Sequence, residues 1–231
     1  MKLMSARFLC TDIYAITCES MSAGRSNLEI VRELLQAGVK IIQYREKEKT
    51  KREKYEQCLL ISRMCQEAGA LFIVNDDVDI ALAVRAGGVH VGQDDLPVDV
   101  VRSVVGPELV IGVSAGNPEE AAAAVAGGAD YLGVGPVFAT GTKLDAGAPV
   151  GVDLLAYLKE RYNVPLVAIG GISATNITQV FAGGADCAAM ISALVTAPDI
   201  AATIKMIRQQ LQKDGFAAHT DGRSDSRGKK V

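Results

Sequence analysis

The stretch Ala126-Gly127-Gly128-Ala129-Asp130, followed at once by the apolar run Tyr131-Leu132-Gly133-Val134, decides the fold because it recurs along this 231-residue chain. Similar alanine–glycine stretches precede apolar runs at Ala37-Gly38-Val39, Ala68-Gly69-Ala70, Ala86-Gly87-Gly88-Val89 and Ala182-Gly183-Gly184-Ala185-Asp186. Glycine just beyond a helix end tolerates the left-handed backbone conformation that terminates helices. The repeat therefore predicts the same helix-to-strand turn five times.

Working outward from these turns, eight short apolar runs alternate with eight helix-like segments. The expected strands are Ile13–Thr17, Lys40–Tyr44, Leu71–Asn75, Val89–Val91, Val110–Ser114, Tyr131–Val134, Leu166–Ile169 and Cys187–Ile191. The expected helices are Asn27–Gln36, Arg52–Glu67, Val78–Val84, Val98–Val104, Pro118–Val125, Val152–Lys159, Asn176–Phe181 and Ile200–Leu211. Such alternation implies parallel strands joined by right-handed crossovers.

Eight strand–helix units in this length predict an α/β fold, a single (β/α)8 TIM barrel. The strands lack strict polar alternation, as expected where both faces of a sheet are covered. A doubly wound open sheet is the competing fold, but the turn from Thr17 to Ser26 has no GxGxxG motif. We expect residues 1–212 to form the TIM-barrel catalytic domain and residues 213–231, which are polar and poor in apolar residues, to be a disordered tail.

Composition narrows the class of function. The formal net charge is −3, which does not favour a general nucleic-acid partner, and no apolar run is long enough to span a membrane. Residues 1–10 lack the apolar core of a signal peptide. The five cysteines are scattered without a CxxC motif, which argues against a disulfide framework or a zinc site and favours a cytoplasmic location. Cys58 and Cys65, seven apart, are expected on one buried helix face.

The second strand is followed by Gln43-Tyr44-Arg45-Glu46-Lys47. Because side chains alternate along an extended chain, Gln43, Arg45 and Lys47 can line one side of it. Active sites of TIM barrels form at the C-terminal ends of the strands. An amide and two cations at that end suit a phosphate site, although charge runs are also common on solvated turns.

Carboxylates follow the next two strands, in Asn75-Asp76-Asp77 and in Asp94-Asp95. Neighbouring strands can each supply one carboxylate to a shared cation, and magnesium typically takes one or two carboxylates plus phosphate oxygens and water. With Arg45, Lys47 and Lys143 nearby, the expected ligand is a polyanion, most economically a diphosphate. Asp77 can alternatively cap the helix that begins at Val78.

A second anion site is expected after the seventh and eighth strands, where TIM barrels commonly bind phosphate through backbone N–H groups. Gly170 and Gly171 permit close backbone approach there, and Ile191 and Ser192 supply further donors; a mere tight turn is the alternative. Lys143 could instead form a Schiff base, as in an aldolase. His90, inside a short apolar run without a Ser or Cys nucleophile motif, is more typical of a core or supporting residue than of a catalytic base.

Seven segments in order resemble the thiamine phosphate synthase family, also called thiamine phosphate pyrophosphorylase. They are QYREK (43–47), VNDDVDIAL (74–82), GVHVGQDDLP (88–97), IGVSAG (111–116), DYLGVGPVFATGTK (130–143), IGGI (169–172) and MISAL (190–194). The resemblance implies a TIM-barrel transferase that forms thiamine phosphate from 4-amino-5-hydroxymethyl-2-methylpyrimidine diphosphate and 4-methyl-5-(2-hydroxyethyl)thiazole phosphate. Diphosphate leaves, and one magnesium ion per active site assists the substitution.

The resemblance also implies roles for individual residues. The pyrimidine diphosphate would contact Gln43, Tyr44, Arg45, Glu46, Lys47, Asn75, Ser114 and Lys143, of which Lys143, Arg45 and Ser114 would be catalytic. The thiazole phosphate would contact Thr140, Gly141, Thr142, Gly171, Ile191 and Ser192. Magnesium would bind Asp76 and Asp95, and the family pattern selects Asp95 over Asp94. The loop Thr140-Gly141-Thr142 departs from the family, which often has proline between the threonines.

Three other functions remain open from the sequence. A thiazole tautomerase-like relative would need no magnesium or diphosphate site, an aldolase would use Lys143, and a non-catalytic barrel would only bind a phosphate ligand. The expected partners are small-molecule substrates, without nucleic acid or membrane, and a homo-oligomer is possible.

Overall fold

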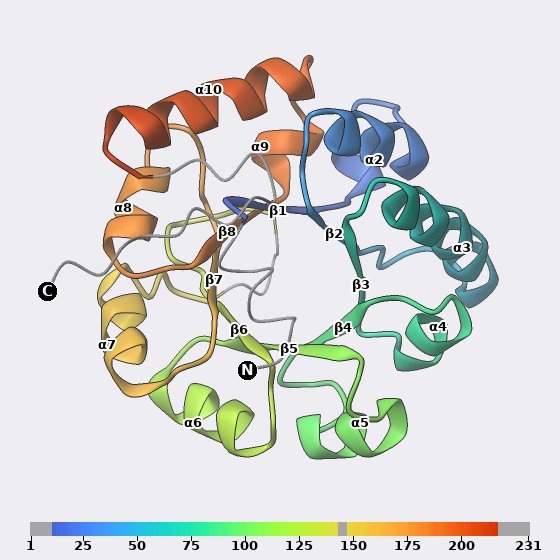
Figure 1. The fold of residues 1–231 in the computed structure, drawn as a ribbon, viewed down its shortest axis with the longest axis horizontal. Coiled ribbons are helices and arrows are strands. Elements are labelled where there is room, and N and C mark those ends of the chain that lie inside the picture. The colour runs from blue at the N-terminus through green and yellow to red at the C-terminus, as the bar shows by residue number, and fades with distance from the viewer. Residues whose placement is uncertain (1–10, 143–146, 217–231) are drawn as a thin grey trace, which may run out of the picture.

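A computed structural model describes residues 11–142 and 147–216, and these residues form a closed eight-stranded parallel barrel (Figure 1). The strands are β1 (Ile13–Ile16), β2 (Ile41–Tyr44), β3 (Leu71–Asn75), β4 (Gly88–Val91), β5 (Val110–Ala115), β6 (Tyr131–Val134), β7 (Leu166–Ile169) and β8 (Cys187–Met190). Each strand pairs with the next in sequence, and β8 pairs with β1 through Ala188 and Ile13. This closure confirms the TIM barrel and excludes the open sheet.

The helices form a ring around the barrel in chain order (Figure 1). They are α2 (Asn27–Gln36), α3 (Lys51–Glu67), α4 (Val78–Ala83), α5 (Val98–Val105), α6 (Pro118–Ala126), α7 (Asp153–Arg161), α8 (Ile177–Ala182) and α10 (Ile200–Lys213). Two further short elements, the 3₁₀ turn η1 (Glu19–Met21) and the helix α9 (Ser192–Val195), were not predicted. In the part of the chain described, no helix combines the length and the apolarity that a bilayer crossing requires.

Strand alternation divides the core into two layers. Inside the barrel, the apolar cluster comprises Tyr14, Ile16, Ile41, Leu71, Ile73, Val110, Tyr131, Val167, Cys187 and Ala189. The intervening strand residues, such as Ile13, Ile42 and Phe72, pack outward against the helices in a larger cluster. Both faces of each strand are therefore buried, which explains the missing polar alternation in the sequence.

Local sequence signals set several helix starts. Ser26 and Thr50 cap α2 and α3, and each forms a capping box with the glutamate three residues later, Glu29 or Glu53. Replacing such a cap with alanine typically costs about 1 kcal/mol. Cys58 and Cys65 lie buried on one face of α3, as predicted, and burial raises the pKa of both thiols to about 12.

The repeated glycine turn is confirmed at four of its five positions. The glycines with a left-handed backbone are Gly38, Gly69, Gly128 and Gly184, with φ angles of +78°, +62°, +93° and +97°. In the fifth copy the prediction was wrong, because Arg85 adopts the positive φ of +52° instead. Gly88 serves packing there, since an added Cβ would lie 2.9 Å from the carbonyl oxygen of Val110.

The last helix is tied to the segment that precedes the first strand. Arg208 of α10 donates from Nε to Oδ2 of Asp12 at 2.8 Å and from Nη1 to the carbonyl oxygen of Ala37, also at 2.8 Å. Asp12 precedes β1 and is only 1% exposed, so this buried pair joins the first strand to the last helix.

The chain stays packed beyond the expected domain boundary at residue 212. Helix α10 continues to Lys213, and the ring of Phe216 lies 5.9 Å from that of Phe181 on α8. The rest of the predicted tail, residues 217–231, and the predicted catalytic Lys143 lie outside the described residues.

Candidate active site

A cavity of about 260 Å³ opens at the C-terminal ends of the strands. It collects most of the residues that the sequence singled out. The predicted residues that line it are Gln43, Arg45, Lys47, Asn75, Asp76, Asp95, Ser114, Thr140, Thr142, Gly171, Ile191 and Ser192. Asp94, Gln93 and His90 line it as well. Polar groups from six strands thus converge on one concave site, which is the usual form of a small-molecule site.

The alternation of β2 continues past its end at Tyr44. Gln43, Arg45 and Lys47 all reach the cavity, as the spacing predicted. The backbone N–H of Arg45 donates to Oγ1 of Thr17 at 3.0 Å, and the N–H of Thr17 donates to the carbonyl oxygen of Gln43 at 2.9 Å. These two bonds hold the extended segment against β1 and so keep both cations on the cavity side.

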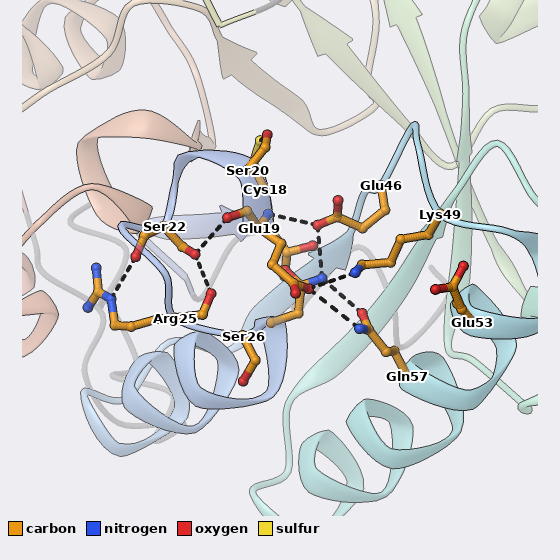
Figure 2. A network of polar contacts seen from close by, with 12 residues as sticks. Cys18, Glu19, Ser20, Ser22, Arg25, Ser26, Glu46, Lys49, Glu53 and Gln57 are labelled. Atoms are coloured by element: carbon orange, nitrogen blue, oxygen red, sulfur yellow. Dashed lines mark hydrogen bonds and ion pairs between the residues drawn. The ribbon is translucent and has the colours of Figure 1, made fainter.

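Tyr44 and Glu46 occupy the opposite side of this segment and do not line the cavity. The hydroxyl of Tyr44 donates to Oε1 of Gln57 at 3.0 Å. Oε1 of Glu46 accepts from Nδ2 of Asn27 at 2.8 Å. The same oxygen accepts from the backbone N–H of Glu19, also at 2.8 Å (Figure 2). The predicted contact of these two residues with the diphosphate stays a prediction, and their side chains are occupied outside the cavity. Gly141 is also absent from the lining.

The bonds of Glu46 belong to a network that joins two loops (Figure 2). Lys49 Nζ lies 3.1 Å from Oε2 of Glu19, and Gln57 Nε2 donates to the same oxygen at 3.4 Å. The network ties the β2–α3 loop to η1 in the β1–α2 connection. Because Arg45 and Lys47 flank Glu46, this anchoring on the outer side fixes where the two cations stand on the inner side.

Asp76 and Asp95 meet at the cavity wall. Their mutual contact, together with burial, raises the pKa of Asp76 to about 6; burial is the largest cause and the charge of Asp95 the next. Lys47 opposes the shift, with Nζ 3.6 Å from Oδ2 of Asp76. Asp95 is held by the backbone N–H of Gly92, which donates to Oδ2 at 2.7 Å. Two carboxylates this close favour a shared proton or a shared cation.

The carboxylates of Asp76 and Asp95 suit magnesium, which is usually completed by water and ligand oxygens, better than a metal that takes all its ligands from the protein. Among residues 11–142 and 147–216, no group of three or more His, Cys, Asp or Glu side chains could hold a metal ion. A cation held by Asp76 and Asp95 would need water and ligand oxygens to complete its coordination, and magnesium usually binds in this way.

Asp77 faces away from this pair. It stands at the N-cap position of α4, but its side chain makes no capping hydrogen bond. Its carboxylate instead lies 2.9 Å from Nζ of Lys54 and 3.1 Å from Nζ of Lys51, both on α3. The alternative prediction for Asp77 was therefore right that it occupies the N-cap position of α4 and wrong that its side chain caps the helix. Asp76 takes the left-handed φ of +61°, which separates the directions of the two carboxylates.

The floor of the cavity carries a chain of polar groups that sequence reasoning missed. Nε2 of Gln43 donates to the hydroxyl of Tyr14 at 2.7 Å, and the hydroxyl oxygens of Tyr14 and Tyr131 are 2.9 Å apart. The ring of His90 lies with Nδ1 2.9 Å from the hydroxyl of Tyr131 and Nε2 3.0 Å from Oγ of Ser114. Burial lowers the pKa of His90 to about 4. The available signal was the strand position of the two tyrosines, which share the inward face with Gln43.

The other half of the cavity depends on Gly170 and Gly171 after β7, with φ angles of +100° and +64°. A Cβ on Gly171 would lie 2.5 Å from the carbonyl oxygen of Ala139, and one on Gly170 would lie 2.6 Å from Cα of Pro136. The sequence suggested room for a ligand at these glycines. The structure shows that the loop after β6 fills the space next to their Cα atoms.

This close packing brings the loop after β6 to the start of α9. Oγ1 of Thr142 donates to Oγ of Ser192 at 3.3 Å, and the N–H of Thr142 donates to Oγ1 of Thr140 at 3.2 Å. Thr140, Thr142 and Ser192, which all carry hydroxyls, therefore line the cavity together. Their elements, the loop after β6 and the start of α9, lie across the barrel from β2, which leads to Arg45 and Lys47.

A closed barrel with acidic, cationic and hydroxyl groups at its C-terminal mouth defines a TIM-barrel enzyme for phosphate-bearing small molecules. Residues 13–194 match the family model described as thiamine monophosphate synthase. The chain therefore belongs to the thiamine monophosphate synthase family.

Individual relatives agree with this assignment. The thiamine-phosphate synthase of Pelotomaculum thermopropionicum is 52% identical over 197 residues, which cover 85% of this chain and 90% of that protein. The thiamine-phosphate synthase of Lawsonia intracellularis is 46% identical over 212 residues, or 92% and 96% of the two chains. The solved structure of thiamine phosphate pyrophosphorylase from Pyrococcus furiosus superposes with a TM-score of 0.82 at 38% identity, covering 90% of this chain and 98% of that one.

Proposed function

We propose that this chain is a thiamine-phosphate synthase that joins 4-amino-5-hydroxymethyl-2-methylpyrimidine diphosphate to 4-methyl-5-(2-hydroxyethyl)thiazole phosphate. The bond between the pyrimidine methylene carbon and the diphosphate oxygen breaks, and a bond from that carbon to the thiazole nitrogen forms. Thiamine phosphate and diphosphate are the products. The observation that carries the proposal is one cavity with cations and a carboxylate pair on one wall and hydroxyl donors on the other.

The wall formed by Arg45, Lys47, Asp76 and Asp95 suits the diphosphate. Asp76 and Asp95 would hold one magnesium ion, completed by diphosphate oxygens and water. When bound, magnesium neutralises negative charge on the departing diphosphate. Arg45 and Lys47 bind the same group and stabilise the charge that develops as it leaves, an electrostatic contribution that is usually the largest in catalysis. Asn75 and Lys143 belong to this half by family resemblance.

The opposite wall suits the thiazole phosphate. Thr140, Thr142 and Ser192 offer hydroxyls, and Gly171 and Ile191 complete the surface. With this division of the cavity, the thiazole ring would lie between its phosphate and the pyrimidine methylene, and the thiazole nitrogen would attack a carbon held in place. Orientation of two reactants in one site contributes several kcal/mol to catalysis. The substitution needs no protein nucleophile.

The proposal is tested with purified protein and both substrates. We expect thiamine phosphate only when both substrates and magnesium are present, loss of product with EDTA, and recovery when magnesium is restored. Absence of product with magnesium would overturn the proposal. Magnesium-independent isomerisation of a thiazole phosphate would support the tautomerase-like alternative, and a borohydride-trapped lysine adduct would support the aldolase.

Gly171→Ala is expected to raise the KM for the thiazole phosphate at least tenfold. Alanine at a φ of +64° is strained, and its Cβ would push away the carbonyl of Ala139 and with it the loop that carries Thr140 and Thr142. The strain alone costs about 1–2 kcal/mol of stability. Steady-state kinetics with each substrate varied in turn would measure the effect.

Gly69→Ala is the matched control for this variant. Gly69 has nearly the same φ, +62°, but an added Cβ would meet nothing within 4 Å, and it lies in the turn between α3 and β3. Both variants should lose thermal stability, and only Gly171→Ala should lose thiazole phosphate affinity. Equal KM values in the two variants would refute the assignment of this wall.

A further inference from the structure

The hydrogen-bonded chain on the cavity floor has two ends that both face the cavity. It begins at Gln43 on β2, passes through Tyr14 on β1, Tyr131 on β6 and His90 on β4, and ends at Ser114 on β5. All four distances lie between 2.7 and 3.0 Å, which is the range of good hydrogen bonds. Five strands thus contribute to one continuous connection across the barrel.

The barrel makes room for this chain by omitting two side chains. A Cβ on Gly112 of β5 would lie 2.0 Å from Cζ and 2.3 Å from the hydroxyl oxygen of Tyr131. A Cβ on Gly133 of β6 would lie 2.8 Å from Cε1 of His90. The register places Gly112 beside both rings, since it pairs with His90 on one side and with Tyr131 on the other. The interior is therefore shaped around the two rings.

The protons along the chain can be assigned from its donors and acceptors. The amide of Gln43 donates through Nε2 to the Tyr14 oxygen, so the Tyr14 proton is available for Tyr131. Tyr131, whose oxygen accepts this hydrogen bond, can donate its own hydroxyl proton in a hydrogen bond to Nδ1 of His90. A neutral ring that accepts at Nδ1 carries its proton on Nε2, and Nε2 then donates to Oγ of Ser114.

We propose that Tyr14, Tyr131 and His90 are positioning residues that give the two ends of the chain opposite hydrogen-bonding characters. Gln43, whose Nε2 is used by Tyr14, presents its Oε1 acceptor to the cavity. Ser114, whose oxygen accepts from His90, presents its hydroxyl proton as a donor. The site thus offers one fixed acceptor and one fixed donor to the heterocycle bound above it.

This polarity matches an aminopyrimidine and opposes an oxopyrimidine. An exocyclic amino group donates, and the ring nitrogen beside it accepts. In the analogue with a 4-oxo group, the carbonyl accepts and the ring nitrogen carries a proton, so both contacts become unfavourable. A site with buried polar groups rejects a mismatched partner strongly, because its own groups are left unpaired. This inference rests on the proposed function, and it deepens the assignment of the pyrimidine half.

Tyr131→Phe tests the chain by removing one hydroxyl while keeping the ring. We expect the KM for the aminopyrimidine diphosphate to rise about tenfold and the KM for the thiazole phosphate to stay within about twofold. Preference for the aminopyrimidine over its 4-oxo analogue, measured by competitive inhibition, should fall at least tenfold. Tyr157→Phe is the control, because it removes an exposed tyrosine hydroxyl on the outer helix α7 that does not line the cavity. Undiminished preference in Tyr131→Phe would overturn the proposal.

A second measurement does not depend on activity or on the stability of a variant. The chain has only two histidines, His90 and His219, so ¹⁵N-histidine labelling of the whole protein gives the Nδ1 and Nε2 signals of two rings, and His219→Gln identifies the pair that belongs to His90. We expect the His90 proton on Nε2 in the free protein. A proton on Nδ1 would refute the assigned direction, even if thiamine phosphate is formed. If no thiamine phosphate forms but the proton is on Nε2, the proposed reaction fails and the ordered chain stands.

Discussion

Replacing Asp76 or Asp95 with asparagine should lower kcat/KM for thiamine phosphate formation about 100- to 1000-fold, the loss typical of removing one preorganised electrostatic group. Each variant removes one of two carboxylates that would hold magnesium against the diphosphate. The magnesium concentration for half-maximal rate should rise as well. Initial rates over a magnesium titration would measure both effects.

Asp79→Asn is the matched control for these variants. Asp79 lies on α4 and pairs with Lys51 on the outside of the barrel, with Nζ 3.0 Å from Oδ2, and it does not line the cavity. Its substitution should leave the magnesium dependence unchanged. Wild-type rates in Asp76→Asn and Asp95→Asn would refute the metal assignment.

The same Asp76→Asn substitution should stabilise the metal-free protein at alkaline pH. The pKa of Asp76 is raised to about 6 in the folded protein. Folding therefore takes up protons, and stability that is present at low pH is lost as the pH rises through about 6. Asparagine does not ionise, so Asp76→Asn should not lose stability in this pH range. Its Tm should exceed that of the wild type at pH 8 and equal or fall below it near pH 4. Magnesium should narrow the difference at pH 8, because it binds the wild type better.

Arg45→Met should lower kcat/KM for the pyrimidine diphosphate roughly 30- to 900-fold. This corresponds to a loss of about 2–4 kcal/mol of transition-state stabilisation. Methionine keeps much of the aliphatic bulk and removes the charge that faces the cavity. Inhibition by inorganic diphosphate should weaken in parallel, which separates lost anion binding from general disruption. Steady-state kinetics and diphosphate inhibition constants would measure the two effects.

Lys49→Met provides the comparison for Arg45→Met. Lys49 is a cation of the same loop, but it pairs with Glu19 on the outer side and does not line the cavity. Lys49→Met should lose little activity, because the hydrogen bonds that anchor Glu46 to Glu19 and Asn27 do not involve Lys49. A similar loss in both variants would indicate that loop placement, rather than charge in the cavity, determines the rate.

The repeated fold was predictable from sequence because each turn and each strand is a local signal. Strands β3, β6 and β7 were predicted residue for residue, and the others within one residue at either end. The short elements η1 and α9 were not predictable in the same way. Helix α9 has four residues, too few for helical periodicity, and its existence depends on the loop and on α10 packed around it. Arg85 shows that a glycine-rich stretch need not place its positive φ on glycine.

The alternation of side chains along an extended chain predicted which residues of the segment 43–47 line the cavity. Assigning every residue of this family motif to the ligand did not separate the residues that line the cavity from those that do not. Alternation selected Gln43, Arg45 and Lys47, and all three line the cavity. The family motif added Tyr44 and Glu46, which by the same alternation belong to the other side. Tyr14 and Tyr131 required the three-dimensional register, because only the closed barrel shows that their hydroxyls meet across its interior.

Closure of the barrel by its last strand–helix unit has a consequence for the order of events during synthesis. Strand β1 pairs with β2, which follows it closely, and with β8, which is made near the end. Asp12 can form its ion pair only after Arg208, 196 residues later in the chain, has been synthesised. A ribosome that has released only the first seven strand–helix units therefore carries an unsealed sheet with exposed edges on β1 and β7. The nascent chain completes its core in a late step, when α10 leaves the exit tunnel, and aggregation during translation is a hazard until then.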